Sequence, residues 1–393
     1  MSQATVVFAW ELGQGFGHVA RLLPLAKALR GRGYRCVFAV CLHGMVADLL
    51  RAAGFEVRQV ASSPLESAYR GQQMVSSYGD ILELRGYGDA ARLRAALRPW
   101  EQMLQQQRPR LLVADYAPTA QLAARGRCPV VAVGDWFSLP PHEAAVFPSF
   151  RPTAARIAEA SLLSVVNAEL AARGQPALTR LPQLLQAQGN FVVTLPELDC
   201  HGDARRHPAV GPLEALPAPV YRQHPTQDYF AYLGQEKAPT AKVLDFLAGS
   251  NLTGGIFLRA GAPDQVAHWR RRGLTIFTDP QDLPVRVAAA RCVIHHGGLG
   301  TLQMVLALGR PQLFVPNHME QKGNARAVGP LKIGVSMVSD GIFEAAHLGS
   351  AMDYLLGRES FASKAATLAE EIAGRDNQQG LTRVLSRIEK LCA

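Results

Sequence analysis

The chain has 393 residues, of which 48% are hydrophobic and 19% are charged, an ordinary composition for a soluble globular protein. This length exceeds what one hydrophobic core usually supports, so we expect two domains. The formal net charge of +9 is spread along the chain, and basic and aromatic residues do not interleave as in nucleic-acid-binding segments. We expect no nucleic-acid partner, whereas the charge favours an anionic nucleotide or, weakly, an anionic membrane surface.

No segment approaches the roughly 18 uninterrupted apolar residues of a membrane-spanning helix, and the first residues lack the basic and apolar regions of a secretion signal. These features predict a cytoplasmic protein without a transmembrane segment. The six cysteines have no zinc-type spacing and are expected to be free thiols; they are Cys36, Cys41, Cys128, Cys200, Cys292 and Cys392.

The first predicted elements are a strand, a glycine turn and a helix. Residues 6–10 are rich in β-formers, residues 13–18 read Gly-Gln-Gly-Phe-Gly-His, and residues 19–30 carry apolar side chains at helical spacing. Glycines at 31 and 33 end the helix, and residues 34–40 read as the next strand. The pattern predicts a βαβ unit.

A nicotinamide dinucleotide site would need G-x-G-x-x-G and an acidic residue on the ribose about twenty positions later. Here the glycines fall as G-x-G-x-G, and the second strand ends Ala39-Val40-Cys41 without an acid. This reading is therefore not favoured.

His18 closes the glycine turn at the carboxyl end of the first strand, where ligands collect in parallel sheets. An imidazole titrates near neutral pH, so His18 is a candidate general base. The apolar run 111–114 ends at Asp115, which would emerge at the same sheet edge and could orient the histidine. Alternatively, His18 caps its own helix, and Asp115 is the N-cap of a helix entered through Pro118.

An aromatic loop follows, with Trp136, Phe137, Phe147 and Phe150 among prolines, and a polar stretch occupies residues 62–87. We expect these segments, with Gly17, to contribute to an acceptor pocket. The alternative is that the aromatic side chains pack the loop against the domain.

The segment 199–225 is rich in proline, arginine, histidine and glycine, which is typical of a linker. A new β-rich strand with a glycine turn begins at residue 228. We therefore predict domains at 1–215 and 216–379, with a last helix, 380–393, that packs back on the first domain. Alternation of strand and helix patterns predicts an α/β fold with parallel sheets.

The segment 292–328 is the most informative part of the chain. A short apolar strand ends at His295, Gly297, Gly298 and Gly300 follow, and a helix begins near Thr301. Glycines let a ligand approach the backbone, and a helix N-terminus attracts anions, so the pattern predicts a bound phosphate. An ordinary tight turn is the alternative. Metal binding by His295 and His296 is not favoured, because no third ligand is evident.

Downstream, Gly309 and Pro311 end this helix, residues 312–315 form another strand, and Glu320 and Gln321 lie just beyond it. The spacing H-x-G-x-x-G-T, G-x-P, P-x-x-x-E-Q and N-A resembles the donor-binding signature of nucleotide-sugar-dependent glycosyltransferases. The H-H-G-x-x-G-T form is similar to the antibiotic and sterol members of the UDP-glycosyltransferase family.

The resemblance implies the GT-B arrangement, two Rossmann-like domains facing each other across a cleft. It also implies roles for several residues. The diphosphate would be held by His295 and by the backbone of Gly297, Gly298, Gly300 and Thr301. The sugar hydroxyls would be bound by Glu320 and Gln321, and the nucleobase would be contacted by Gln281. His18 would be the base that deprotonates the acceptor, and Asp115 its partner.

Two positions depart from the family pattern. Gln303 lies where many members have a glutamate that binds the ribose, and Thr278 replaces the tryptophan that stacks on uracil in plant members.

The implied reaction is an inverting, metal-independent sugar transfer from a UDP- or dTDP-linked donor, without another cofactor, to a hydroxyl of a small-molecule or lipid-like acceptor. Two alternatives stay open: a nucleotide-sugar epimerase of the same fold and a non-catalytic nucleotide-sugar-binding subunit.

Overall fold

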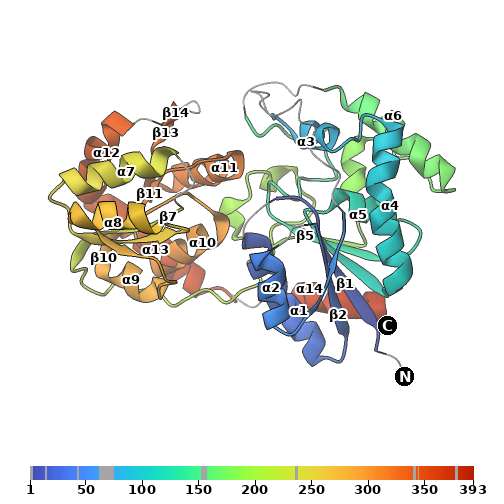
Figure 1. Ribbon diagram of the computed structural model, residues 1–393, viewed down its shortest axis with the longest axis horizontal. Coiled ribbons are helices and arrows are strands. Elements are labelled where there is room, and N and C mark those ends of the chain that lie inside the picture. Colours follow the sequence, from blue (N-terminus) through green and yellow to red (C-terminus); the bar gives the residue numbers. More distant parts are fainter. Residues whose placement is uncertain are drawn as a thin grey trace. The chain divides into compact units, whose positions relative to one another are not determined.

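The computed structural model describes residues 3–13, 16–41, 44–61, 75–151, 157–234, 238–339, 342–343, 345–376 and 379–393. The chain divides into two compact units (Figure 1). Unit 1 comprises Met1–Glu214 together with Gln378–Ala393, and unit 2 comprises Ala215–Asn377. Most of the polar stretch expected at 62–87, namely 62–74, lies outside the described residues, as do residues 14 and 15 of the first glycine turn.

Unit 1 is built on a six-stranded sheet in the order β3-β2-β1-β4-β5-β6, and every neighbouring pair is parallel. Its strands are β1 (Thr5–Trp10), β2 (Arg35–Val40), β3 (Glu56–Gln59), β4 (Leu111–Asp115), β5 (Val130–Gly134) and β6 (Gly189–Val192). Its helices are α1 (Gly17–Gly31), α2 (Met45–Ala52), α3 (Tyr78–Leu84), α4 (Ala90–Gln107), α5 (Pro118–Ala124), α6 (Glu159–Ala172) and α14 (Gln379–Cys392). This strand order is that of a Rossmann-like domain.

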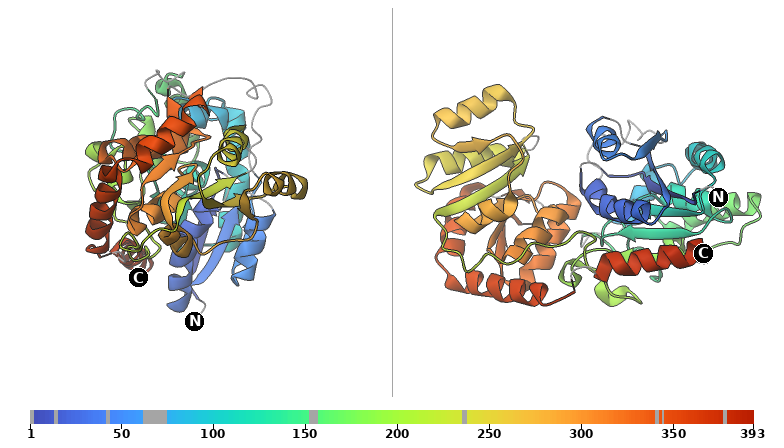
Figure 2. Two further views of the ribbon diagram at one scale, coloured as in Figure 1. Left: turned by 90° about the vertical axis from the view of Figure 1, so that its left-hand side faces the viewer. Right: turned by 90° about the horizontal axis from the view of Figure 1, so that it is seen from below.

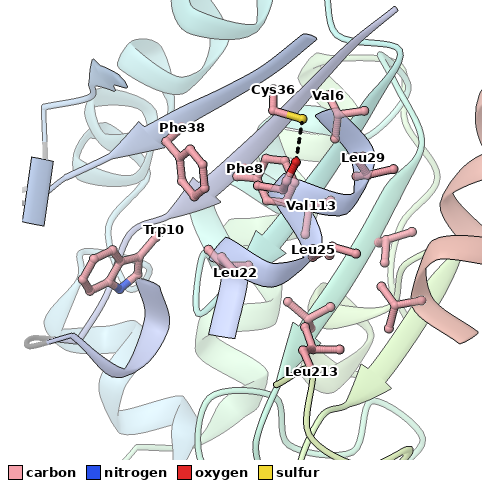
Figure 3. Close-up of a cluster of buried hydrophobic side chains, with 14 of the residues drawn as sticks. Val6, Phe8, Trp10, Leu22, Leu25, Leu29, Cys36, Phe38, Val113 and Leu213 are labelled. Atoms are coloured by element: carbon pink, nitrogen blue, oxygen red, sulfur yellow. Dashed lines mark hydrogen bonds between the residues drawn. The ribbon is translucent and has the colours of Figure 1, made fainter. Parts of the chain in front are cut away.

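The core of unit 1 joins the sheet to α1 and α14. Alternate residues of β1, among them Val6 and Phe8, meet Leu22, Leu25 and Leu29, which are spaced at helical intervals on α1 (Figure 3). The Cys36 thiol donates a hydrogen bond to the Ala26 carbonyl at 3.5 Å and joins β2 to the same helix. Helix α14 adds three buried side chains to this cluster: Val384, Leu385 and Ile388. The last helix of the chain therefore completes the core of unit 1 (Figure 2).

Unit 2 repeats this topology. Its sheet has the order β12-β11-β10-β7-β8-β9, again with every neighbouring pair parallel. The strands are β7 (Gln227–Gly234), β8 (Gly254–Arg259), β9 (Thr275–Phe277), β10 (Ala290–His295), β11 (Gln312–Phe314) and β12 (Gly334–Ser336), and β13 (Val338–Ser339) pairs with β14 (Ile342–Phe343). The helices are α7 (Ala238–Gly249), α8 (Pro263–Arg271), α9 (Leu283–Ala289), α10 (Leu299–Leu308), α11 (Met319–Val328), α12 (Leu348–Leu356) and α13 (Glu359–Ala373). The α/β class with two Rossmann-like units is confirmed.

The segment expected to be a linker, 199–225, contains the boundary between the two units and is mostly exposed or half-buried, with a few packed side chains. Asp199 and Arg205 form an ion pair at 2.6 Å with 1% and 6% of their side chains exposed. Leu213 is 4% exposed in the core cluster of unit 1, whereas Val220 is 9% exposed in a cluster of unit 2. The segment therefore joins the two units, and these few side chains anchor it on either side of the boundary.

No helix among the described residues is long and apolar enough to cross a membrane. All six cysteines are free. Within the described part of the chain, no cluster of three histidine, cysteine or carboxylate side chains has the geometry to hold a metal ion.

Candidate active site

His18 occupies the second position of α1, just beyond the carboxyl end of β1. The N-cap of this helix is Phe16, and it has no side-chain capping hydrogen bond, so the helix-capping alternative for His18 is wrong. The imidazole lies between two aromatic rings, with its centroid 5.0 Å from that of Trp10 and 5.9 Å from that of Tyr116. A Cβ at Gly13, where φ is +86°, would come within 2.6 Å of His18 Nε2. Glycine at position 13 therefore makes room for the ring.

Asp115 ends β4 beside Trp10 of β1 and is fully buried. Its Oδ2 lies 3.1 Å from Nδ1 of His18, whose side chain is 11% exposed. The distance is that of an ion pair, but the two atoms do not meet hydrogen-bond geometry. Catalytic contacts of this kind are often loose before a substrate binds. With Nδ1–H toward Asp115, Nε2 would carry the lone pair that accepts a proton.

The alternative role of Asp115 as a helix N-cap is also wrong, because the N-cap of α5 is Ala117 and no side chain caps it. The next residue after Asp115, Tyr116, has a φ of +48°, which is uncommon for a residue with a side chain. Its carbonyl accepts a hydrogen bond from Leu12 N at 3.0 Å, which ties the end of β4 to the segment after β1. Backbone strain of this kind is often found where side chains are held for function.

Arg21 is a site residue that the sequence analysis missed. Its Nη1 donates to Asp115 Oδ1 at 2.9 Å, and its Nη2 lies 2.5 Å from Asp135 Oδ2. The Arg21 side chain is 10% exposed, and its guanidinium bridges two buried carboxylates, those of Asp115 and Asp135. Position 21 follows His18 by three residues, and side chains at this spacing share a helix face, which is the signal that was available.

Asp135, directly after β5, is held by Arg21 and by Ser138. Burial alone would raise the pKa of Asp135, but attraction to Arg21 and a hydrogen bond from the Ser138 backbone outweigh it and lower the pKa to about 2. Asp135 is therefore a carboxylate at neutral pH. It fixes Arg21, which in turn fixes Asp115 against His18.

The aromatic loop residues pack against one another. Trp136 is 2% exposed and Phe147 is 3% exposed, and Phe147 lies 5.0 Å from the Tyr78 ring. Phe137 is half-buried and contacts Phe150 at a centroid distance of 4.7 Å. Burial leaves Trp136 and Phe147 no surface to offer an acceptor in this structure, so the packing alternative describes them better. Gly17, by contrast, is exposed at the first turn of α1.

The second set of predicted residues lies in unit 2, where β10 turns into α10. Gly297 has a φ of +81°, and a Cβ there would come within 3.2 Å of the Gln321 carbonyl oxygen, so the fold itself requires glycine at this position. Gly298 and Gly300 have no such requirement. Neither has a positive φ, and an added Cβ would meet nothing within 4 Å at either position.

Gly298 is the N-cap of α10, Gly300 is exposed, and Thr301 is half-buried. The first amides of a helix lack partners within the helix and carry its positive dipole end. Gly300 in the first turn costs helix stability relative to alanine, by about 1 kcal/mol, without relieving any contact in the protein. Close approach of a ligand would account for both glycines.

His295 is buried within the glycine turn, and its expected contact with a diphosphate stays a prediction. The ring is 1% exposed, its Nε2 lies 2.7 Å from Gln312 Oε1, and its Nδ1 accepts the Gly297 N–H at 3.0 Å. A carboxamide oxygen only accepts, so the proton is on Nε2. Burial lowers the pKa of His295 to about 4, against the opposing hydrogen bond to Gln312. His295 thus shapes the turn as a neutral side chain.

The neighbouring His296 joins the carboxyl ends of three strands. Its Nε2 accepts the Gly234 N–H at 2.9 Å at the end of β7, and its Nδ1 lies 2.8 Å from the Val315 carbonyl beyond β11. The Asn317 carboxamide is 2.7 Å from the same Nδ1. Side chains of successive residues at a strand end point in opposite directions, so the two histidines contact different groups: His295 contacts Gln312, and His296 contacts Gly234 and Val315.

Helix α11 packs against this turn. Asn324 donates to the Gly297 carbonyl at 2.9 Å, while Glu320 and Gln321 lie in the first turn of α11, both half-buried. The Gln321 oxygen accepts the Asn317 N–H at 2.8 Å. The structure thus brings Glu320 and Gln321 beside the glycine turn.

Gln281 lies elsewhere, in the loop after β9. Its amide nitrogen donates to the Asp279 carbonyl at 2.9 Å, and its oxygen accepts from Arg286 at 2.7 Å. The Arg286 guanidinium lies 4.1 Å from the centroid of the Phe277 ring. Contact of Gln281 with the nucleobase of a donor stays a prediction.

Residues 281–388 match the family model described as the erythromycin biosynthesis protein CIII-like, C-terminal domain. This segment begins at Gln281 and contains the glycine turn and α11. Among curated protein sequences, none matches the chain.

Solved structures with a similar fold include several glycosyltransferases. CalG4, the calicheamicin glycosyltransferase, has 20% sequence identity and a TM-score of 0.68, with 100% of this chain and 98% of that chain covered. The spinosyn rhamnosyltransferase SpnG complexed with thymidine diphosphate has 17% identity and a TM-score of 0.66, with coverage of 98% and 100%. SnogD from Streptomyces nogalater has 18% identity and a TM-score of 0.64, with 100% of both chains covered. The fold is therefore that of GT-B glycosyltransferases.

Proposed function

We propose that this protein is an inverting glycosyltransferase that moves a sugar from a nucleoside diphosphate sugar to a hydroxyl of a small-molecule acceptor. The contact between His18 and Asp115 carries the proposal, because a buried carboxylate that faces an imidazole at a ligand-binding sheet edge is the arrangement of a general base. The matched C-terminal family and the fold shared with CalG4, SpnG and SnogD support the same reaction class.

In the proposed reaction, His18 Nε2 removes the proton of the acceptor hydroxyl as its oxygen attacks the anomeric carbon. The bond from that carbon to the diphosphate breaks in the same step, on the opposite face, so the configuration inverts. Asp115 stabilises the imidazolium that forms, and Arg21 holds Asp115 in place. In-line alignment of acceptor, carbon and leaving group lowers the barrier through proximity.

The departing diphosphate would be stabilised by the N-terminus of α10. Amides of the first turn and the helix dipole provide positive charge where negative charge develops. The hydroxyl of Thr301 is available to donate a further hydrogen bond. Glu320 and Gln321 would bind sugar hydroxyls. Because the amides and dipole of α10 supply the positive charge, we expect transfer to need no added metal and to persist in EDTA.

The donor is a UDP- or dTDP-linked sugar in this proposal, and SpnG, which was solved with thymidine diphosphate, makes dTDP the first nucleotide to test. SpnG was also solved with the spinosyn aglycone, so this aglycone is the first acceptor to screen. Melting temperatures should be measured with UDP, dTDP, GDP and NAD, because a ligand that binds the native state raises the melting temperature. Stabilisation by dTDP or UDP alone is expected; stabilisation by none of the nucleotides would remove the donor-site assignment.

The catalytic assignment is tested by His18→Ala. We expect acceptor-dependent release of dTDP to fall at least 100-fold while dTDP still raises the melting temperature. His224→Ala, at an exposed histidine, is the control and should retain activity. Full turnover in His18→Ala would show that another group is the base.

The two alternatives give different results in the same assays. An epimerase would convert the nucleotide sugar without any acceptor, which proton NMR of the donor detects. A non-catalytic subunit would bind the nucleotide and show neither reaction.

A further inference from the structure

Unit 1 contains a cavity of about 940 Å³ that includes none of the candidate active-site residues His18, Arg21, Asp115 or Asp135. It lies along the edge strand β6, between the loop after β5, the 3₁₀ helix Leu181–Leu185 with its flanks, the segment 205–210 and one face of α14. Cavities that hold small molecules have volumes of roughly 300–1,000 Å³. Its size is therefore suited to a small ligand.

The charge of the cavity wall is strongly one-sided. The wall has one carboxylate, Glu143, and six cationic side chains: Arg180, Arg205, Arg206, Arg383, Arg387 and Lys390. Arg205 is neutralised by Asp199. Among the described residues, the other five form no ion pair with a carboxylate. Such a concentration of positive charge around a concave surface attracts and holds anions.

Helix α14 contributes the most ordered part of this charge. Arg383, Arg387 and Lys390 follow one another at spacings of four and three residues, so they share one face of the helix. The hydroxyl residues Thr382 and Ser386 line the cavity beside them. The neighbouring face carries the apolar side chains that complete the core. Like charges at these spacings repel and destabilise a helix, and a bound anion would reverse this effect.

Two further observations show that the positive charge is positioned rather than dispersed. The Arg387 Nε donates to the Gln188 carbonyl at 2.8 Å, which holds the guanidinium at the cavity wall near the start of β6. The Nε of Arg180 is buried without a hydrogen-bond partner among the described residues. Nearby, burial lowers the pKa of His142, and the charges of Arg205, Arg180 and His207 lower it further against the effect of Glu143.

We propose that this cavity is a second ligand site, which binds a small anion through a phosphate group. Guanidinium groups match the geometry of phosphate oxygens, and lysine and hydroxyl side chains add further donors. The apolar part of the wall, which includes Leu139, Phe191 and Val210, would contact a carbon skeleton attached to the phosphate. The same chemistry is offered by a soluble phosphate ester and by the headgroup of an anionic lipid.

The test must separate this cavity from the diphosphate site proposed on α10. We therefore use Gly300→Asp as the background, because a carboxylate at that exposed position repels phosphate from the helix N-terminus. Pyrophosphate binding to the Gly300→Asp protein is measured by calorimetry. The measurement is repeated on a protein that carries Arg383→Gln and Lys390→Gln in addition. Both side chains are exposed on α14, so their removal leaves the core unchanged.

We expect the Gly300→Asp protein to bind one pyrophosphate, and the two added substitutions to weaken that binding at least 10-fold. The matched control adds Arg98→Gln and Lys364→Gln instead, which removes the same charge from exposed positions of α4 and α13 and should change the affinity less than 2-fold. Equal loss of affinity in both proteins would mean only general attraction and would overturn the proposal.

Vesicles distinguish the two sources of the phosphate. Binding to phosphatidylglycerol vesicles, but not to phosphatidylcholine vesicles, that is lost with Arg383→Gln and Lys390→Gln and kept in the control supports a lipid headgroup. Pyrophosphate binding with the same pattern and no vesicle binding supports a soluble ligand. Absence of both kinds of binding in the Gly300→Asp protein, with an unchanged melting temperature, would overturn the proposal.

Discussion

Arg21 Nη1 donates to Asp115 Oδ1 at 2.9 Å, so the candidate base His18 and the arginine contact opposite oxygens of one carboxylate. The other end of the guanidinium pairs with Asp135. A single cation therefore separates two buried anions that would otherwise repel each other.

Arg21→Gln should destabilise unit 1 by about 3–5 kcal/mol, because it leaves two buried carboxylates without their cation. Urea unfolding measures this loss. Arg32→Gln, which breaks the exposed pair with Glu389, should cost less than about 1 kcal/mol. A loss for Arg21→Gln as small as that of the control would show that solvent already screens the pair.

Asp115→Asn should preserve the shape of the side chain while removing its charge, so the imidazolium that forms during transfer loses its stabilisation. We expect acceptor-dependent turnover to fall by about 10²–10⁴-fold with little change in dTDP affinity. Single-turnover kinetics separates the two quantities. If turnover were unchanged, Asp115 would have a structural role only.

Gly300→Ala distinguishes a ligand-binding glycine from a structural one. The free protein should gain up to about 1 kcal/mol, because alanine favours the helix and the new Cβ meets no atom. Affinity for dTDP, measured by calorimetry, should fall. Gly349→Ala is the matched control, since Gly349 also holds the second position of a helix, α12, and it should stabilise without altering affinity. Unchanged dTDP affinity in Gly300→Ala would place the phosphate elsewhere.

His295 should make unit 2 sensitive to mild acid. Its pKa is about 4 when folded, compared with about 6.5 in the unfolded chain, so the unfolded state binds the extra proton between these values. Stability is fully present above pH 6.5 and is lost as the pH falls toward 4, by about 2 kcal/mol between pH 7 and pH 5.

His295→Asn keeps an acceptor for the Gly297 N–H but cannot titrate. Denaturant unfolding at pH 7 and at pH 5 should therefore show a smaller loss of stability in this variant than in the unsubstituted protein. Equal losses would assign the acid sensitivity to other groups.

Much of the fold follows from the sequence, because fully buried parallel strands are continuous apolar runs and glycines mark their ends. The nearness of His18 and Asp115 was also predictable, since both follow neighbouring parallel strands at the same sheet edge. Arg21 was not identified, because its importance depends on Asp135, which reaches the same edge from a third strand.

The different environments of His295 and His296 were beyond the sequence pattern. Adjacent residues at a strand end face opposite ways, and it is His295, rather than His296, that is buried against Gln312 of β11. The segment 199–225 contains the boundary between the units, as its composition indicated, but composition does not show that Leu213 and Val220 pack into the two cores.

Helix α14 has a consequence for synthesis on the ribosome. Unit 2 is complete in sequence once residue 377 has been made, whereas unit 1 lacks Val384, Leu385 and Ile388 until the final helix emerges. While unit 2 is translated, the part of unit 1 already made therefore exposes the apolar surface that these three side chains later cover. We expect nascent chains stalled before residue 379 to bind chaperones that recognise exposed apolar surface, and chains extended through α14 to be released from them.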